Sequence, residues 1–177
     1  YRMKNKLIAV LTLLQIVPLA FLELFMHPGE NMGPALYVDQ FSMIMCMVIS
    51  IVGSLICVYG LAYMKEHEHH LKLATSRQGR FFFFMVLFLG AMNGLVFSNN
   101  LLWLYFFWEV TTFCSFMLIK HDDTEIAVKN ATRALWMNML GGVAFVMALI
   151  IFRSQGMPLS LQEIITAESA SKFILLP

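Results

Sequence analysis

The sequence is short of charge and of cysteine. Only 13% of its 177 residues are charged, the formal net charge is +1, and its three cysteines form no CxxC pair. A typical soluble domain has about 25% charged residues. This composition excludes a disordered chain, a disulfide scaffold and an ordinary cytosolic enzyme, and the near-zero net charge argues against binding to nucleic acid.

The sequence also lacks motifs for soluble catalysis or for holding electrons. It has no glycine-rich phosphate loop, no Ser/His/Asp pattern and no haem-type histidine pair. Residues 66–70 read Glu-His-Glu-His-His, but their spacing fits a metal site poorly, and we interpret them as a solvated loop. Any role of His67, His69 and His70 stays open. We therefore expect no cofactor and no metal ion.

Apolar residues are abundant instead. They make up 59% of the chain, and the mean hydropathy is +0.73. A chain of this size cannot hide so many in one core, whereas a membrane-spanning helix needs about 20 of them in a row. The runs are too long and too uniform for barrel strands. The sequence predicts an all-α, polytopic integral membrane protein with five transmembrane helices, at about residues 7–26, 38–64, 81–97, 101–119 and 134–152.

The regions outside these helices complete the predicted organisation. Residues 1–6 form a basic start, residues 7–152 the transmembrane region, and residues 153–177 a surface segment followed by the truncated start of another helix. Basic residues occupy alternate connections, which places the start and the second and fourth connections in the cytoplasm. Because the chain begins with Tyr1 and ends as a new apolar run begins, we expect a fragment.

Glu109 is the most informative residue, because it lies at the centre of the predicted fourth helix. An acidic side chain there costs about 2.5–3.5 kcal/mol on insertion scales, so it is expected to have a function. Tyr105 and Thr112 lie near it on a helical projection. A carboxyl held away from bulk water suits a proton relay. The alternative is a protonated carboxyl that joins two helices by a hydrogen bond.

Three further charged residues are candidates for the ion-translocating site. Lys129 and Arg133 lie one helical turn apart at the cytoplasmic start of the fifth helix, where they would either supply positive potential to Glu109 or only set the orientation. Asp39 opens the second helix, where an acid suits the positive end of the helix dipole, so capping is its favoured interpretation.

Seven short blocks resemble the proton-translocating antiporter-like membrane subunits. This family includes the largest such subunit of respiratory complex I, the large subunit of Mrp-type antiporters and a subunit of energy-converting membrane hydrogenases. The match covers about residues 37–160. Its blocks are YVDQFSM at 37–43, VY at 58–59, YM at 63–64, RFF at 80–82, SNNLL at 98–102, FWE at 107–109 and CSFMLI at 114–119.

The resemblance assigns roles to several residues. It implies that Glu109 is the family's essential membrane glutamate, that Asp39 corresponds to an aspartate at a helix start, and that Arg133 replaces a lysine. The complex I version usually carries an Arg-x-Gly-Asp run in the next helix, whereas residues 139–142 here read Met-Leu-Gly-Gly. Together with the run Arg-Ala-Leu-Trp-Met-Asn at residues 133–138, this departure favours the hydrogenase-associated branch.

The resemblance also implies a function. The expected role is proton or sodium translocation in a membrane-bound redox complex of a bacterial or archaeal cytoplasmic membrane. The partners would be other membrane subunits, the lipid bilayer and a peripheral redox module of the hydrogenase or NADH-dehydrogenase type. The chain itself would perform no redox chemistry. The alternatives are a subunit of an Mrp-type Na⁺/H⁺ antiporter and a non-pumping structural subunit.

Overall fold

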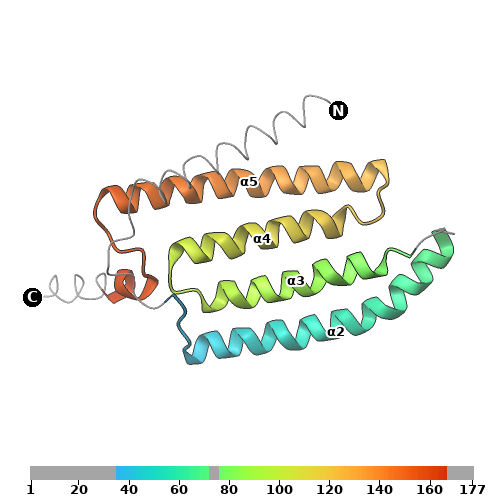
Figure 1. Ribbon diagram of the computed structural model, residues 1–177, viewed down its shortest axis with the longest axis horizontal. Helices are drawn as coiled ribbons and strands as arrows, with labels where there is room; N and C mark the ends of the chain where they lie inside the picture. Colours follow the sequence, from blue (N-terminus) through green and yellow to red (C-terminus); the bar gives the residue numbers. More distant parts are fainter. Residues whose placement is uncertain (1–34, 72–75, 167–177) are drawn as a thin grey trace, which may run out of the picture. The chain divides into compact units, whose positions relative to one another are not determined.

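The computed structural model describes residues 35–71 and 76–166, and these are helical apart from short connections. The long helices are α2 (Gln40–Leu71), α3 (Gln78–Phe97), α4 (Leu101–Ile119) and α5 (Glu125–Ser154), as drawn in Figure 1. All four are long and apolar enough to cross a membrane. The all-α prediction is confirmed for this part of the chain, and the first predicted span, at residues 7–26, lies outside it.

The observed bounds differ most where polar residues extend a helix beyond its apolar part. Helix α4 coincides with the predicted span, whereas α2 continues to Leu71 and α5 begins at Glu125. The prediction of a loop at residues 66–70 was therefore wrong, since this stretch is the last part of α2. Hydropathy identifies the length that fits in hydrocarbon, but backbone hydrogen bonding continues into the polar layer.

Side-chain caps mark two of the helix starts. The Asn100 Oδ1 accepts a 2.8 Å hydrogen bond from the Leu102 backbone N–H at the start of α4. The Thr124 Oγ1 accepts one of 3.1 Å from the Ala127 N–H at the start of α5. Each cap satisfies a backbone donor that has no partner inside its helix, which fixes where the helix begins.

The chain divides into two compact units. Unit 1 comprises Tyr1–Tyr37, Ser98–Phe106 and Trp136–Pro177, and unit 2 comprises Val38–Phe97 and Phe107–Leu135. Helices α4 and α5 each contribute residues to both units.

Within unit 1, Asn99 is the centre of a buried hydrogen-bonded junction. Its backbone N–H donates to the Ala35 carbonyl (3.0 Å), and its carbonyl accepts from the Leu161 N–H (2.7 Å). Its side-chain Nδ2 donates to the Ser160 Oγ (3.2 Å), and its Oδ1 accepts from the Gln162 N–H (3.2 Å). Asn99 is only 2% exposed. One residue thus fastens two segments that are distant in sequence to the start of α4.

A small apolar core lies beside this junction in unit 1. Tyr105, Val146 and Leu149 are buried against one another, and the Tyr105 ring stacks on Phe145 with centroids 5.7 Å apart. The core holds the first turns of α4 against the second half of α5 through van der Waals contacts and the burial of apolar surface.

Within unit 2, α2 and α3 approach closely because small residues line their contact. A Cβ added at Gly53 would lie 2.4 Å from a methyl carbon of Leu89. One turn away, the Cys57 thiol donates to the Met85 sulfur at 3.4 Å. Small residues at such positions let two helix backbones pack tightly in a bilayer.

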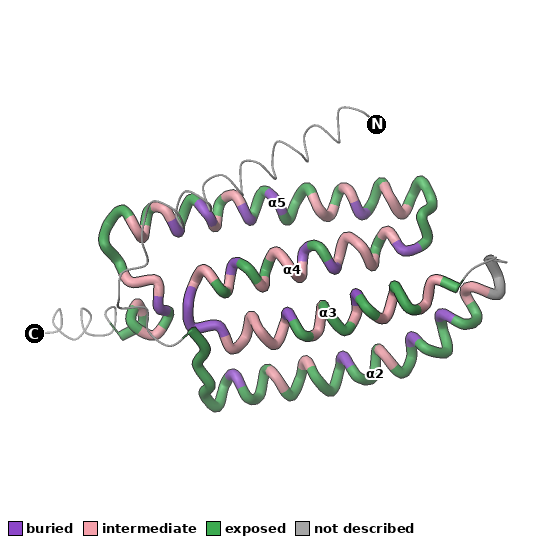
Figure 2. The backbone as a smooth tube through the Cα atoms, viewed as in Figure 1, coloured by how far each residue is buried: buried purple, intermediate pink, exposed green. Residues whose placement is uncertain are grey.

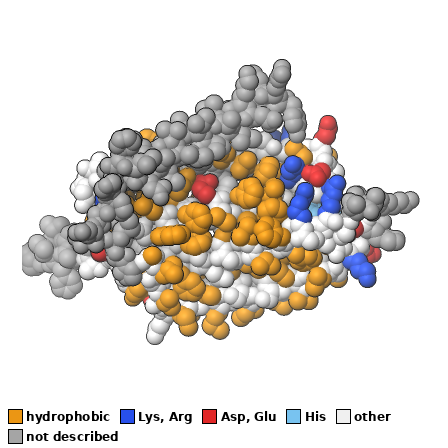
Figure 3. All heavy atoms as spheres, viewed as in Figure 1, with side chains coloured by type: hydrophobic (Ala, Val, Ile, Leu, Met, Phe, Trp, Pro, Cys, Tyr) orange, Lys and Arg blue, Asp and Glu red, His pale blue; other side chains and the backbone are white. Residues whose placement is uncertain are grey.

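Most of the α2 surface is nevertheless exposed in the structure (Figure 2). Hydrophobic side chains also cover much of the face seen in Figure 3. Phe41 and Val58 on α2 are each more than two-thirds exposed. Apolar surface of this extent is expected of a helix that faces lipid or other membrane protein.

Candidate functional site

Glu109 lies at the middle of α4, within the candidate membrane span Leu101–Ile119. Its side chain is partly buried, and Thr112, one turn further along, is only 4% exposed. The neighbouring hydroxyls of Thr111 and Ser115 donate to backbone carbonyls of α4 itself, at 2.7 and 2.8 Å. The Glu109 carboxyl lies at the centre of α4, as predicted. Tyr105, on the same helix, belongs to the core of unit 1.

The two predicted basic partners lie on α5 in the same unit as Glu109. Helical rise places Arg133 about 12 Å from the start of α5 and Glu109 about 15 Å from the end of α4. The two charges thus lie at similar depths along consecutive helices, whereas Lys129 lies about 6 Å from the start of α5. Both basic side chains are exposed in the structure.

Asp39 is engaged as a cap. Its Oδ1 accepts a 2.6 Å hydrogen bond from the Ser42 backbone N–H and a second from the Ser42 hydroxyl. These bonds, that of the hydroxyl first, lower the pKa of the Asp39 carboxyl below its ordinary value. The geometry is that of an N-cap at the first turn of α2, and it agrees with the capping interpretation of the sequence.

A second cluster of charges, which the sequence did not reveal, lies at the end of unit 2 where α2 and α4 finish. Asp123 has a left-handed backbone (φ 53°) and its Oδ2 accepts a 3.0 Å hydrogen bond from the Arg77 Nη1. The Arg80 Nη2 lies 3.7 Å from the same oxygen, and the Lys120 Nζ lies 3.8 Å from the other. One carboxylate therefore lies beside three cations, two at the start of α3 and one in the connection after α4.

Two residues of the supposed loop at 66–70 extend this charged end. The Glu68 carboxylate accepts hydrogen bonds from the Arg77 backbone N–H (2.6 Å) and the Ser76 hydroxyl (2.9 Å), which fixes the start of α3. The His67 Nε2 lies 2.9 Å from the Asp122 Oδ1. The only signal in the sequence was the concentration of titratable residues in two separate connections, and it did not indicate which of them would pair.

His121 is the buried member of this end, at 7% exposure. Its ring meets the edge of Phe81, with centroids 5.2 Å apart. Burial lowers the pKa of His121 below its ordinary 6.5, with further lowering by Arg80 and Arg77, while Asp122 acts in the opposite direction. The folded state therefore favours the neutral imidazole.

We expect the folded protein to lose stability on acidification through His121. Because its folded pKa lies below the unfolded value of 6.5, its stabilisation is complete above pH 6.5 and is lost as the pH falls through the folded pKa. The His121→Leu variant should show a smaller drop in melting temperature between pH 8 and pH 5 than the unmodified protein, measured in detergent. An equal drop in both proteins would contradict this prediction.

The described helices and the mid-span carboxyl define an integral membrane protein of the polytopic, helical class. Two family models match the chain. The one described as NADH-ubiquinone oxidoreductase (complex I), chain 5 N-terminus, matches residues 25–82, and the one described as NADH:quinone oxidoreductase/Mrp antiporter, TM, matches residues 98–176. The chain therefore belongs to the complex I/Mrp antiporter family, as its sequence blocks predicted.

Curated relatives carry antiporter names. The chain is 34% identical over 144 residues to the Na⁺/H⁺ antiporter subunit A1 of Staphylococcus haemolyticus, a match that covers 81% of this chain and 17% of the relative. It is 31% identical over 140 residues to the subunit of that name in Staphylococcus aureus, covering 78% of this chain and 16% of the relative. The chain thus spans about a sixth of their length. No solved structure matches it.

Proposed function

We propose that this chain forms part of the ion-translocating region of an antiporter-like membrane subunit, with Glu109 as the group that takes up and releases the ion. The observation that carries this proposal is the carboxyl at the centre of a candidate membrane span. Such a residue is costly within a bilayer, and a position facing the protein interior or a water-filled cavity offsets that cost.

The chemistry requires only a reversible proton transfer. Glu109 gains one proton from water that enters from one side and becomes neutral, and it later gives the proton to water on the other side and becomes negative. Arg133, at a similar depth on α5, would attract the negative form and favour release of the proton. Lys129, closer to the end of α5, would act more weakly because solvent screens it.

Asp39 belongs to this proposal in a structural role. Its hydrogen bonds to Ser42 stabilise the first turn of α2, close to the aqueous boundary of the candidate span Gln40–Glu68. A group that holds a helix start in this way is suited to positioning the helix rather than to carrying an ion across the membrane.

Among the members of the family, we favour an antiporter of the Mrp type. The names of the curated relatives support this choice, because both are Na⁺/H⁺ antiporter subunits. The second candidate is the redox-coupled subunit expected from the sequence, and the complex I description of the first family model supports it. The departure at residues 139–142, which favoured the hydrogenase-associated branch, receives no specific support from either description.

Inverted membrane vesicles that contain the full-length protein and its partner subunits test this choice. In vesicles acidified inside by respiration, an antiporter releases internal protons when Na⁺ or K⁺ is added, and a pH-sensitive dye follows the release. A redox-coupled subunit would instead acidify the vesicles when its own electron donor is supplied, with no response to added cations. A non-pumping subunit would show neither signal.

A further inference from the structure

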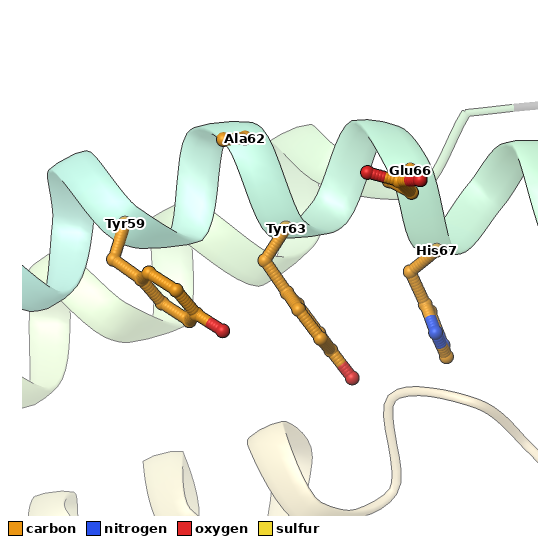
Figure 4. Close-up of a pocket in the computed structure, with 5 residues that line it drawn as sticks. All are labelled: Tyr59, Ala62, Tyr63, Glu66 and His67. Atoms are coloured by element: carbon orange, nitrogen blue, oxygen red, sulfur yellow. The ribbon is translucent and has the colours of Figure 1, made fainter.

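Three aromatic rings form a row along one side of α2, at its charged end. The Tyr59 and Tyr63 rings stack with centroids 6.0 Å apart, and the Tyr63 and His67 rings stack at 5.5 Å. Figure 4 shows all three rings extending from the same side of the helix. Because the residues are four apart, each step advances about 6 Å along the axis. The row therefore runs about 12 Å from His67 towards the middle of the span.

The row borders a cavity of about 400 Å³, lined by Tyr59, Ala62, Tyr63, Glu66 and His67. Two phenol rings and an imidazole thus border one space, which is roomy enough to hold water. The lining runs from His67, near the polar end of the candidate span Gln40–Glu68, to Tyr59, about two turns further in. The cavity therefore begins at the aqueous end of unit 2 and extends along the last turns of that span.

The charged groups around the cavity form two sets of contacts, one around His67 and one around Asp123. The His67 Nε2 lies 2.9 Å from the Asp122 Oδ1, while Asp123 holds the nearby cations. The titratable and charged groups around His67 are Lys65, Glu66 and Glu68 on α2, Arg77 and Arg80 at the start of α3, and Lys120, His121, Asp122 and Asp123 after α4. Asp123 thus pairs with Arg77, Arg80 and Lys120, and the charged group within hydrogen-bonding distance of the imidazole is the Asp122 carboxylate.

We infer that this cavity is the entrance through which protons pass between the aqueous phase and unit 2, with the His67–Asp122 pair as the collecting group. The inference rests on the proposed function, since an entrance serves only a protein that moves protons. The imidazole takes one proton at one ring nitrogen and releases one at the other, and cavity water beside the Tyr63 and Tyr59 hydroxyls carries it inward. No covalent bond to a heavy atom changes.

Interfacial tyrosines also occur in membrane proteins purely as anchors. An anchor depends on the ring and not on proton transfer, so a diffusible buffer would not compensate for its loss. A collecting group that has been removed is different, because a small buffer that enters the cavity can deliver the proton in its place. The response to buffer concentration therefore separates the two roles.

The test uses the full-length protein with its partner subunits in vesicles. At about 1 mM buffer, His67→Gln should slow proton transport about 100-fold, in line with the loss of a proton-transfer group. Imidazole at tens of millimolar should restore most of the rate. Tyr63→Phe keeps the ring and removes the hydroxyl, so it should slow transport less and show the same rescue. The matched control is Tyr37→Phe, outside the cavity, which should have no effect.

Two results would overturn the inference. The first is transport at the unmodified rate in both His67→Gln and Tyr63→Phe at low buffer concentration. The second is a loss of rate that imidazole does not restore, with the complex assembled at its normal level, because this would indicate an anchoring role. Either result leaves the proposed function standing if Glu109→Gln still abolishes transport, so the two hypotheses fail separately.

Discussion

Replacing Glu109 with glutamine should reduce ion transport at least about 100-fold, while the complex still assembles. Glutamine has nearly the same shape as the carboxylic acid and it still forms hydrogen bonds, so packing around the middle of α4 is preserved. It cannot gain or lose a proton, so a translocation cycle that passes through this residue stops. The measurement is cation-driven proton release from inverted vesicles, with the amount of assembled complex determined in parallel.

The matched control for this experiment is Glu125→Gln. Glu125 is an exposed acid at the start of α5, so its neutralisation removes the same charge without touching the middle of a span. This variant should transport at the unmodified rate. Normal transport in Glu109→Gln would contradict the proposed role and favour a carboxyl that only joins helices, since glutamine can replace it there.

Removing the Asn99 side chain should destabilise unit 1 by about 2–4 kcal/mol. The Asn99→Ala variant loses two hydrogen bonds, from its Nδ2 to the Ser160 Oγ and from the Gln162 N–H to its Oδ1. Ser160 is only 8% exposed, so water replaces the lost partner poorly. The melting temperature of the purified full-length protein should fall below that of the unmodified protein, because a buried hydrogen-bonded group has been removed.

Asn130→Ala is the control for this prediction, because Asn130 is an exposed residue on α5. It should melt within about one degree of the unmodified protein, as surface substitutions usually change stability little. If Asn99→Ala melted no lower than Asn130→Ala, the junction at residues 98–100 would not contribute to the stability of unit 1.

The sequence predicted the helices where apolar length alone determines them. Helix α4 was placed correctly at both ends, because Asn99 and Asn100 interrupt the apolar run on one side and charged residues follow Ile119 on the other. The predicted end of the span at residue 64 falls short of the end of α2 at Leu71, because hydropathy does not detect that helical hydrogen bonding continues into polar residues.

Glu109 was identifiable because a carboxyl in an apolar run is conspicuous without any structure. The partners of Asn99 were not, because an Asn-Asn pair between two helices also suits an ordinary turn. The pairing of Asp123 with Arg77 joins residues 46 positions apart, and the pairing of His67 with Asp122 joins residues 55 positions apart. A single sequence shows that these charges exist, but only folding selects the pairs.

Asp123 illustrates how two demands can coincide at one position. Its backbone adopts a left-handed conformation, which glycine, asparagine and aspartate tolerate best, and its carboxylate gathers three cations. Glutamate would supply the charge but strain the backbone, and asparagine would suit the backbone but leave Arg77, Arg80 and Lys120 to repel one another. Aspartate is thus the amino acid that meets both requirements of the connection between α4 and α5, a left-handed backbone and a negative charge.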